Sequence, residues 1–203
     1  RFRKNSQHSE KICLIKMITQ QKKEEYAIIL DFLPNGYPFD KRPLHQKSPI
    51  AQAIGRNHFT LLELVPKKEK FLQPYEEVYM GEGEREKIHH IIGRIPLSKL
   101  TQTAKIELDF VIKELVKKDE KRFIEFFNKA GPINTRMHQL ELLPGIGKKH
   151  TKEILEKREE KKFESFEDIK SRVKLIPDPI QVIIRRIYSE LNNEDKHRIF
   201  VQT

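Results

Sequence analysis

The sequence predicts an α+β fold, in which a small five-stranded, OB-like β-barrel precedes an all-helical tail. Five short runs rich in β-branched and aromatic residues occur within residues 26–94, and turn residues separate them. From residue 101 onward, apolar residues recur at helical spacing instead. This change of pattern near residue 100 divides the chain into its two parts.

The β part begins with Tyr26–Leu33, an apolar run that stops at the turn signal Pro34-Asn35-Gly36. Four further strand-like runs follow, at Pro49–Gly55, Phe59–Val65, Glu76–Met80 and Ile88–Arg94. Five strands of this length favour a closed or half-closed barrel over residues 24–100, with the OB fold as the natural candidate. An SH3-like barrel or an open sheet fits the same pattern.

The segment Tyr37–Ser48 is predicted to be an extended surface loop, because it holds two prolines and several basic side chains. Long loops on barrels often carry binding residues. Candidate secondary contacts to nucleic acid in the barrel are the cations Arg56, Lys67, Lys68, Arg85 and Arg94 and the rings Tyr37, Phe39, Tyr75 and Tyr79. The competing interpretation is that the lysines face water and that Tyr79 packs inside the barrel.

Two helices are predicted within residues 101–130. Across Thr101–Lys118 one apolar stripe lies opposite charged positions, formed by Ala104, Leu108, Val111, Ile112 and Leu115. A second helix, about Glu120–Lys129, carries phenylalanines on one side and stops at Gly131-Pro132. We expect these helices to cover the barrel or to brace the tail.

Residues 140–149 read Leu-Glu-Leu-Leu-Pro-Gly-Ile-Gly-Lys-Lys and predict a tight hairpin between two helices. The first helix is predicted from its spacing and its side-chain N-cap, namely Asn134 or Thr135 followed by Met137, Leu140 and Leu143. Pro144-Gly145 ends that helix, since proline lacks the amide proton and glycine accepts a positive φ. A second helix then runs to about Glu160, and Ile146 is expected to point back between the two helices.

The hairpin has the composition of a phosphate-binding site. Two glycines that flank one isoleucine leave the backbone amides of Gly145, Ile146 and Gly147 without bulky side chains at the start of a helix. Unpaired amides and the positive end of a helix dipole attract phosphate oxygens. Lys148 and Lys149 follow directly, where their ammonium groups can reach the same or the next phosphate.

The stretch Leu140–Thr151 resembles the helix-hairpin-helix motif of nucleic-acid-binding proteins, whose hairpin reads Leu-Pro-Gly-hydrophobic-Gly followed by a small or basic residue. In that family the hairpin amides hold one backbone phosphate without reading bases. Carried over by position, the resemblance implies amide donors at Gly145, Ile146 and Gly147, with supporting contacts from Lys148, Lys149 and Thr151. The alternative is a hairpin that serves only as a joint between helices or as a surface for protein docking.

Residues 163–191 predict a helix, a short joint and a helix once more. Ser165 followed by Asp168 resembles a capping box at the start of the first of these helices. The second is predicted from the apolar face of Ile180–Leu191. The joint between them, Ile176–Pro179, has neither of the two glycines of the upstream hairpin.

This second half looks like a degenerate copy of the hairpin, as in tandem helix-hairpin-helix domains, and residues 131–191 then form one domain. We expect the copy to be structural and to bury apolar faces that one hairpin cannot bury alone. Arg185 and Arg186 are candidate secondary phosphate contacts on its last helix. Residues 192–203 are expected to fray.

The 203-residue chain has a formal net charge of +10 and a pI near 9.5, which favours a polyanionic partner. The excess lies at the ends, since residues 1–23 sum to +6, 24–100 to zero, 101–130 to +1 and 131–203 to +3. Residues 1–23 are predicted to be a basic, loosely ordered arm. Alternatively, translation begins at Met17, and the native charge is then nearer to neutral.

Several kinds of site lack support in the sequence. The one cysteine, Cys13, leaves no intramolecular disulfide and no cysteine cluster for a metal. His89 and His90 are adjacent on a predicted strand, so their side chains are expected on opposite faces, and neither a metal nor a cofactor is predicted. No apolar run is long enough to span a membrane, so we expect no membrane partner and a cytoplasmic protein.

Catalysis has little support as well. The sequence contains no nucleophile elbow, no P-loop and no dinucleotide fingerprint. Asp168 lies at about the distance from the hairpin at which helix-hairpin-helix glycosylases carry a catalytic aspartate, but helix capping already accounts for it. Lys148 resembles a Schiff-base lysine only by its place in the hairpin.

The order of the parts, an OB-like barrel, helices and a hairpin tail, looks like a family of uncharacterised archaeal proteins proposed to bind RNA. The similarity covers Glu24 to about Leu191 and is most specific over Tyr26–Asp40 and Leu140–Lys149. It implies an architecture and favours RNA over DNA. The leading hypothesis is therefore a non-catalytic nucleic-acid-binding protein. The alternatives are a protein–protein adaptor with the hairpin as scaffold and, with less support, a nuclease or DNA glycosylase.

Overall fold

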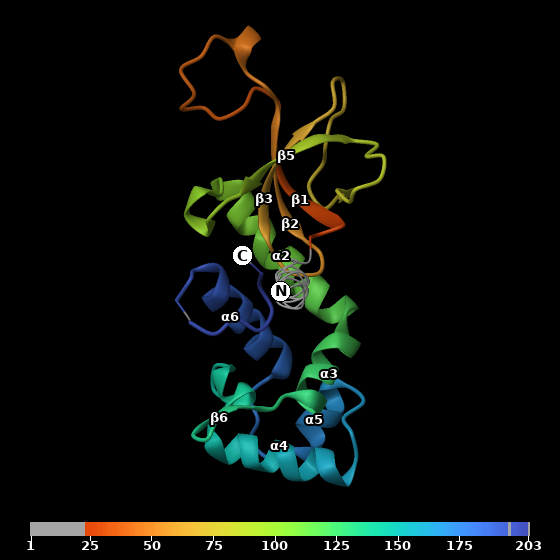
Figure 1. Cartoon of the computed structure of the whole chain (residues 1–203), viewed down its shortest axis with the longest axis vertical. Helices are drawn as coiled ribbons and strands as arrows, with labels where there is room; N and C mark the ends of the chain where they lie inside the picture. Colours follow the sequence, from red (N-terminus) through yellow and green to blue (C-terminus); the bar gives the residue numbers. More distant parts are fainter. Residues whose placement is uncertain (1–22, 195, 203) are drawn as a thin grey trace, which may run out of the picture.

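The structure, a computed structural model, describes residues 23–194 and 196–202. Apart from Lys23, the predicted basic arm over residues 1–23 lies outside the described residues, and so do Cys13 and Met17. The described chain is elongated, with a β-sheet toward one end of the long axis and helices toward the other (Figure 1).

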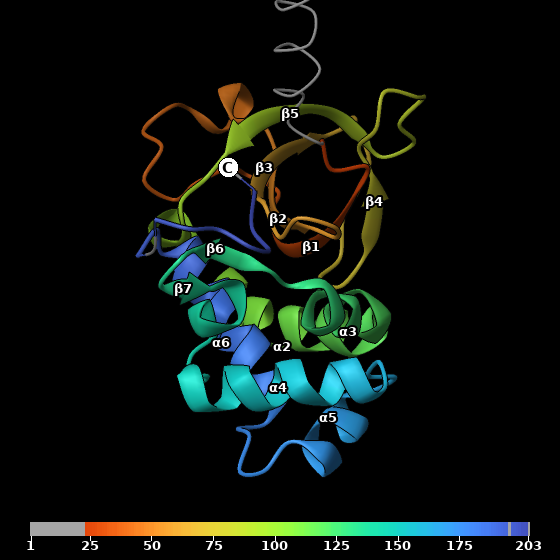
Figure 2. The ribbon, with the colours of Figure 1, turned by 60° about the horizontal axis from the view of Figure 1, so that its bottom comes forward.

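Five strands form one antiparallel sheet and confirm the five strand-like runs of the sequence. They are β1 (Tyr26–Leu33), β2 (Ile50–Gly55), β3 (Leu61–Pro66), β4 (Glu77–Tyr79) and β5 (Ile88–Arg94). Their order in the sheet is β4-β1-β2-β3-β5. The sheet curls into a half-barrel (Figure 2), and no ladder joins the described edge strands β4 and β5. The curled sheet is therefore open rather than closed.

Apolar residues cover both faces of the sheet. One cluster, which fills the inside of the curl, contains Ala27, Ile29, Ala51, Ala53, Leu64, Val78 and Ile88 among its members. Its alanines are small enough for the concave side of a tightly curved sheet. On the other face, Leu30 and Ile54 belong to the larger cluster that continues through the helices. The sheet and the helical part thus share one core.

Helix α2 (Gln102–Lys118) packs on the sheet, and its N-terminus is tied to β1 and β2. The Thr101 hydroxyl accepts a hydrogen bond from the Ala104 N–H (3.0 Å) and donates to Oδ2 of Asp31 (2.6 Å). The Thr101 N–H donates to Oε1 of the fully buried Gln52 (2.8 Å). The predicted apolar stripe is confirmed, because its members are all buried, namely Ala104, Leu108, Val111, Ile112 and Leu115.

After helix α3 (Glu120–Lys129), the helix predicted upstream of the hairpin is replaced by shorter elements. Strand β6 (Pro132–Asn134) pairs with β7 (Met137–His138), and a 3₁₀ helix, η3 (Gln139–Leu142), follows. Oδ1 of Asn134 accepts hydrogen bonds from the N–H groups of Arg136 (2.8 Å) and Met137 (3.0 Å). It therefore closes the β6–β7 turn instead of capping an α-helix, and the prediction of that helix is wrong.

The remaining elements lie close to their predicted bounds. Helices α4 (Lys148–Glu160), α5 (Phe166–Arg172) and α6 (Pro179–Leu191) complete the tail, and short 3₁₀ turns occur at η1 (Leu44–Gln46) and η2 (Leu97–Lys99). The predicted N-cap of α5 is confirmed, because Oγ of Ser165 accepts a hydrogen bond from the Asp168 N–H (3.0 Å). The α+β class is thus established, whereas a tandem helix-hairpin-helix remains a prediction.

The chain after α6 is packed against the core, so the prediction that residues 192–203 fray is wrong for the described part of that segment. Phe200 is only 4% exposed and meets the ring of Phe123 edge to face, with ring centroids 5.3 Å apart. The Gln202 N–H donates to the carbonyl oxygen of His58 (3.2 Å), in the turn between β2 and β3. The tail therefore links α3 to the sheet.

A buried ion pair on α6 holds this tail in place. Nε of Arg186 donates to Oε1 of Glu190 (2.7 Å), and both side chains are almost fully buried. The Glu190 carboxylate also accepts three backbone hydrogen bonds of 2.8–2.9 Å, from Ile199, Phe200 and Val201. Arg186 in turn donates to the carbonyl oxygens of Leu142 (3.0 Å) and His197. One ion pair thus joins α6, η3 and the C-terminal segment.

We predict that Glu190→Ala lowers the free energy of unfolding by about 3–5 kcal/mol, because it leaves the buried Arg186 guanidinium and the three amides without their acceptor. Urea unfolding followed by circular dichroism measures this change. Glu125→Ala is the control, since Glu125 pairs with Lys129 on the surface, and we expect little change from it. Equal unfolding midpoints for the two variants would contradict the role of Glu190.

Candidate nucleic-acid interface

Three apolar side chains anchor the hairpin that joins η3 to α4. Leu140, Leu143 and Ile146 are at most 3% exposed and belong to the main core cluster. Ile146 points inward, as predicted, and Ile154 of α4 is fully buried in the same cluster. Burial of a side chain of this size contributes roughly 1.5–3 kcal/mol to the free energy of folding. These side chains therefore fix the hairpin to the core.

Gly145 is required by the conformation of the hairpin. Its φ is +86°, in the left-handed region that side chains rarely adopt. A Cβ atom at this position would lie 3.2 Å from Cγ of Pro177, in the joint between α5 and α6. The glycine therefore allows both the turn and the close contact with the second joint.

Gly147 has a different role, because neither conformation nor packing within the chain requires it. It is the N-cap of α4 with an extended backbone, φ −96° and ψ −176°, which any residue can adopt. A Cβ atom built on it meets nothing within 4 Å. It also lacks the side-chain oxygen with which Ser, Thr, Asp or Asn usually caps a helix.

The N-terminus of α4 presents backbone donors to solvent. No described residue accepts a hydrogen bond from the N–H groups of residues 147–150, whereas the Thr151 N–H donates to the Gly147 carbonyl oxygen (2.9 Å). Such amides form the positive end of the helix. The prediction is corrected for Ile146, whose N–H donates to the Leu143 carbonyl oxygen (3.0 Å). The open donors at the start of α4 are therefore the amides of residues 147–150, of which only Gly147 was predicted.

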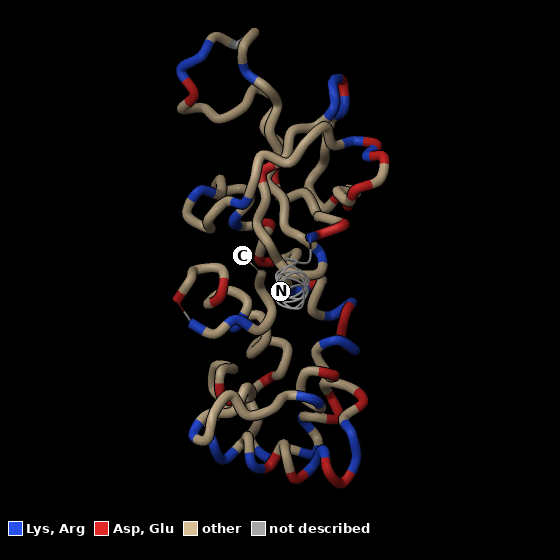
Figure 3. Tube along the Cα trace, in the orientation of Figure 1, with Lys and Arg blue, Asp and Glu red and all other residues tan. Residues whose placement is uncertain are grey.

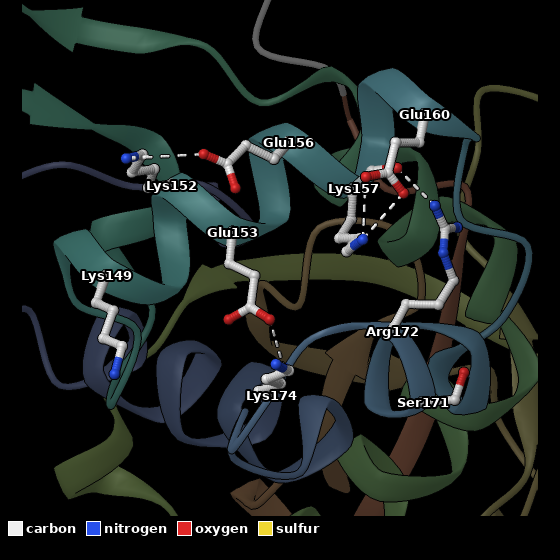
Figure 4. A pocket seen from close by; sticks show the side chains of 9 residues that line it. All are labelled: Lys149, Lys152, Glu153, Glu156, Lys157, Glu160, Ser171, Arg172 and Lys174. Atoms are coloured by element: carbon white, nitrogen blue, oxygen red, sulfur yellow. Dashed lines mark hydrogen bonds and ion pairs between the residues drawn. The ribbon is translucent and has the colours of Figure 1, made fainter.

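Lysines surround this end of α4. Lys148 and Lys149 are exposed, and Lys149 borders a groove of about 670 Å³ between α4 and the α5–α6 joint (Figure 4). Lys174 also lines the groove, and its N–H donates to Oε1 of Glu153 (2.9 Å). No described carboxylate pairs with the ammonium groups of these three lysines. Lys174 was not among the candidates, because its closeness to the hairpin depends on how the two joints pack.

The acidic side chains of the groove are already engaged. Glu156 pairs with Lys152 (3.8 Å) and Glu160 with Lys157 (3.0 Å), as Figure 4 shows. Cations and carboxylates alternate along the tube of α4 in Figure 3. Five cations and three carboxylates line the groove, so its net formal charge is +2.

Two candidate residues are buried and cannot contact a phosphate at the surface. Thr151 is 5% exposed, and among the described residues its Oγ1 has no hydrogen-bond partner. Arg186 lies in the core beside Glu190, because the carbonyl oxygens of the tail and of η3 require a donor there. Its neighbour Arg185 is exposed on α6. The structure therefore excludes Arg186 as a contact and leaves Arg185 as a prediction.

The barrel candidates are not brought to the hairpin. Arg56 donates to Glu77 of β4 (2.6 Å), and Lys68 is exposed beside the half-buried Lys67 in the β3–β4 loop. Arg85 donates to the carbonyl oxygen of Gly81 (3.0 Å). Since the sheet lies toward the opposite end of the molecule (Figure 1), these residues belong to another surface than the hairpin.

Asp168, the aspartate considered for catalysis, is engaged in structure. Oδ2 of Asp168 accepts hydrogen bonds from Arg172 (3.1 Å) and from the Glu164 N–H (3.1 Å). Arg172 also donates to the carbonyl oxygen of Lys161 (2.7 Å) at the C-terminus of α4. Asp168 therefore helps to cap two helices, and nothing in the described structure presents it to a substrate.

His89 and His90 lie together, contrary to the expectation of opposite faces. Their Nδ1 atoms are 2.7 Å apart. The register between β3 and β5 shifts here, with His90 opposite Val65 and Ile88 opposite Pro66, so His89 is the extra residue of a bulge. A bulge interrupts the alternation of side chains. Within the described residues, no group of three or more His, Cys, Asp or Glu side chains could hold a metal ion.

No helix in the described ranges is long and apolar enough to cross a membrane.

The pKa of His138 is lowered, chiefly by burial and further by the charge of Arg158, so its imidazole is neutral at pH 7. In this form Nδ1 of His138 accepts the N–H of Leu140 (3.2 Å) and caps η3. The Glu141 carboxylate accepts the His138 N–H in return (3.2 Å), so a reciprocal capping box closes the turn that leads into the hairpin.

Comparison with known proteins identifies relatives along nearly the whole chain. The model of a family described as a protein of unknown function, DUF655, matches residues 23–202. The uncharacterized protein MJ0038 of Methanocaldococcus jannaschii is 46% identical over 184 residues, which are 90% of this chain and 82% of that protein. The crystal structure of Af1531 from Archaeoglobus fulgidus, of the same family, has 47% identity and a TM-score of 0.80, over 88% of this chain and 100% of that one. The predicted resemblance to an uncharacterised archaeal family is confirmed.

We predict that the two hairpin glycines differ in their tolerance of side chains. Gly145→Ala should lower the free energy of unfolding by about 1 kcal/mol or more, because alanine is strained at φ +86° and presses on Pro177. Gly147→Asp should raise it by a few tenths of a kcal/mol, because aspartate is a better N-cap than glycine. Thermal and urea unfolding of both variants measure the difference, and a loss of stability in Gly147→Asp would show that packing requires this glycine.

Proposed function

The chain belongs to the DUF655 family of proteins of unknown function, and we propose that it is a non-catalytic nucleic-acid-binding protein that holds a backbone phosphate at the N-terminus of α4. RNA is favoured over DNA on the basis of the family resemblance seen in the sequence. The phosphate site consists of the amides of residues 147–150, with Lys148 and Lys149 beside them and Lys174 at the edge of the groove.

The observation that carries this proposal is the glycine at position 147. The chain does not require a glycine there, since the backbone is ordinary and the space around a Cβ atom is empty. A glycine with empty space before unpaired amides allows another molecule to approach the backbone closely. Phosphate suits this position, because it accepts several hydrogen bonds and is stabilised by the helix dipole.

The two ends of α4 support the same assignment. At its C-terminus, the carbonyl oxygens of Lys157 and Lys161 accept hydrogen bonds from Arg172, and Arg158 donates to the carbonyl oxygen of Ala130 (2.8 Å). At the N-terminus, the N–H groups of residues 147–150 have no acceptor among the described residues. A helix that is anchored at its C-terminus and has open amides at its N-terminus is a rigid donor of positive potential, which is what phosphate binding needs.

A site of this type binds backbone and not bases, so it predicts affinity without sequence preference. Its binding should weaken as salt rises, because each contacted phosphate releases counterions.

The alternative function, a protein–protein adaptor, has one observation in its favour. Ile106 and Phe110 lie one turn apart on α2 and are each about half exposed. Lack of any affinity for bare nucleic acid would favour the adaptor.

We predict that Gly147→Asp weakens binding to single-stranded RNA about tenfold or more, because the carboxylate occupies the amides and repels phosphate. Fluorescence anisotropy with labelled RNA and DNA, single- and double-stranded, measures the affinity of the full chain across a salt series. The variant is informative because it should fold at least as well as the parent, and circular dichroism checks this.

The matched control is Gln102→Asp, which adds the same charge at the first residue of α2, a helix already capped by Thr101. It should leave RNA affinity nearly unchanged. If both variants lose affinity equally, the effect is one of overall charge. If Gly147→Asp binds as tightly as the parent, the phosphate site does not lie at the N-terminus of α4.

We predict that Lys149→Gln reduces the salt dependence of binding, lowering the slope of log K against log salt by roughly 0.7 for a single strand. Lys152→Gln is the control one turn further along α4, because Lys152 already pairs with Glu156 (3.8 Å). Its slope should stay close to that of the parent. A slope that falls equally in both variants would mean that any cation on this helix contributes.

A further inference from the structure

An exposed aromatic ring is held in a fixed position on the long loop between β1 and β2. This loop projects from the sheet, away from the helical tail (Figure 1). Phe39 is 78% exposed, and its ring stacks on that of Tyr37, with centroids 4.9 Å apart and planes inclined by 14°. Since Tyr37 covers one face of the ring, the exposed area includes the opposite face.

A tight turn produces this stack. The Asp40 N–H donates to the carbonyl oxygen of Tyr37 (3.1 Å), which closes a β-turn with Pro38 at its second position. Proline is favoured there because its ring presets the backbone angle. The Asp40 carboxylate accepts hydrogen bonds from Nη2 (2.7 Å) and the backbone N–H (3.0 Å) of Arg42. These hydrogen bonds lower the pKa of Asp40 to about 2, so the pair persists at neutral pH.

The lower ring of the stack is fastened to the protein core. Nε2 of Gln52, a fully buried side chain on β2, donates to the Tyr37 hydroxyl oxygen (2.9 Å). The same amide donates to the carbonyl oxygen of Lys99 (3.1 Å), and its Oε1 accepts the Thr101 N–H (2.8 Å). Tyr37 thus cannot turn away without breaking a buried network, and Phe39 rests on a rigid base.

Positive charge lies next to the exposed ring. The loop Tyr37–Ser48 has a net charge of +2, because Lys41, Arg42 and Lys47 outnumber the single carboxylate of Asp40. Since Arg42 is paired with that carboxylate, the cations left for a partner are the exposed Lys41 and the half-buried Lys47. The blue segments of this loop are visible in Figure 3. A flat apolar face beside cations suits a nucleobase with its attached phosphate.

We propose that Phe39 is a stacking site for an unpaired base of single-stranded RNA, with Tyr37 as the residue that positions its ring. The inference rests on the proposed function, because it assigns a second contact to the same class of partner. Double-stranded RNA is excluded as the ligand of this site, since its bases are already stacked on each other. The site is tolerant of sequence, because every base has a flat face.

The stacking site and the phosphate site are far apart. The loop with Phe39 lies beyond the sheet, whereas the hairpin with Gly147 lies in the helical half of the molecule (Figure 1). One strand that touches both must run along the molecule, and a short strand can occupy either. The two sites can therefore be tested separately with variants of one residue each.

The test uses tryptophan fluorescence, because the chain contains no tryptophan. In the F39W variant of the full chain, a single-stranded RNA of about 16 nucleotides, a length that one OB-type domain can cover, should quench the emission. The control variant is F110W, on the exposed face of α2, which should not be quenched. The control ligand is an RNA of equal length with abasic positions, which keeps the phosphates and should not quench F39W.

Affinity provides the second measurement. F39A should weaken binding of the normal RNA about tenfold, as for loss of one stacked base, and should leave binding of the abasic RNA unchanged. If RNA binds by anisotropy while F39W emission stays constant, the stacking site is wrong and the phosphate site stands. If RNA quenches F39W but Gly147→Asp binds RNA as tightly as the parent, the stacking site stands and the phosphate site is wrong. If no RNA binds, both proposals fail.

Discussion

The buried ion pair between Arg186 and Glu190 is the interaction on which the arrangement of the helical part depends. A buried charge is costly unless its partners surround it, and here the carboxylate receives three backbone amides of the C-terminal segment while the guanidinium reaches two carbonyl oxygens. One of those oxygens belongs to Leu142, immediately before the hairpin. The same pair therefore places the hairpin on α6 and brings Phe200 onto the core between the helices and the sheet.

At both proposed contact sites, buried side chains fix the local structure, and the group that would contact the partner is exposed. At the hairpin, buried leucine and isoleucine side chains fix the backbone, while Gly147 leaves its outer surface bare. At the loop, the buried Gln52 fixes Tyr37, while Phe39 is exposed. In each case the group that would meet the partner does not have to be ordered on binding. Such preorganisation lowers the entropic cost of association, which matters for ligands as flexible as single strands.

The two glycines of the hairpin differ in what the structure requires of them. Gly145 is explained by its positive φ and by the contact with Pro177, so it serves the fold. Gly147 is explained by neither, and under the proposed function it keeps the backbone accessible to a phosphate. The second joint, through Pro177, packs against the hairpin and brings Lys174 to the groove. It thus contributes to the site without repeating it.

Local patterns in the sequence determined the strands, most helices and the hairpin, because alternation, helical spacing and Pro-Gly act over a few residues. They did not determine the β6–β7 turn, where the side chain of Asn134 captures two amides. The burial of Arg186, the packing of Phe200 and the pairing of His89 with His90 depend on partners in other elements or on strand register. Those contacts bring together distant parts of the chain, so only the tertiary structure decided which charged side chains face water and which hold the fold.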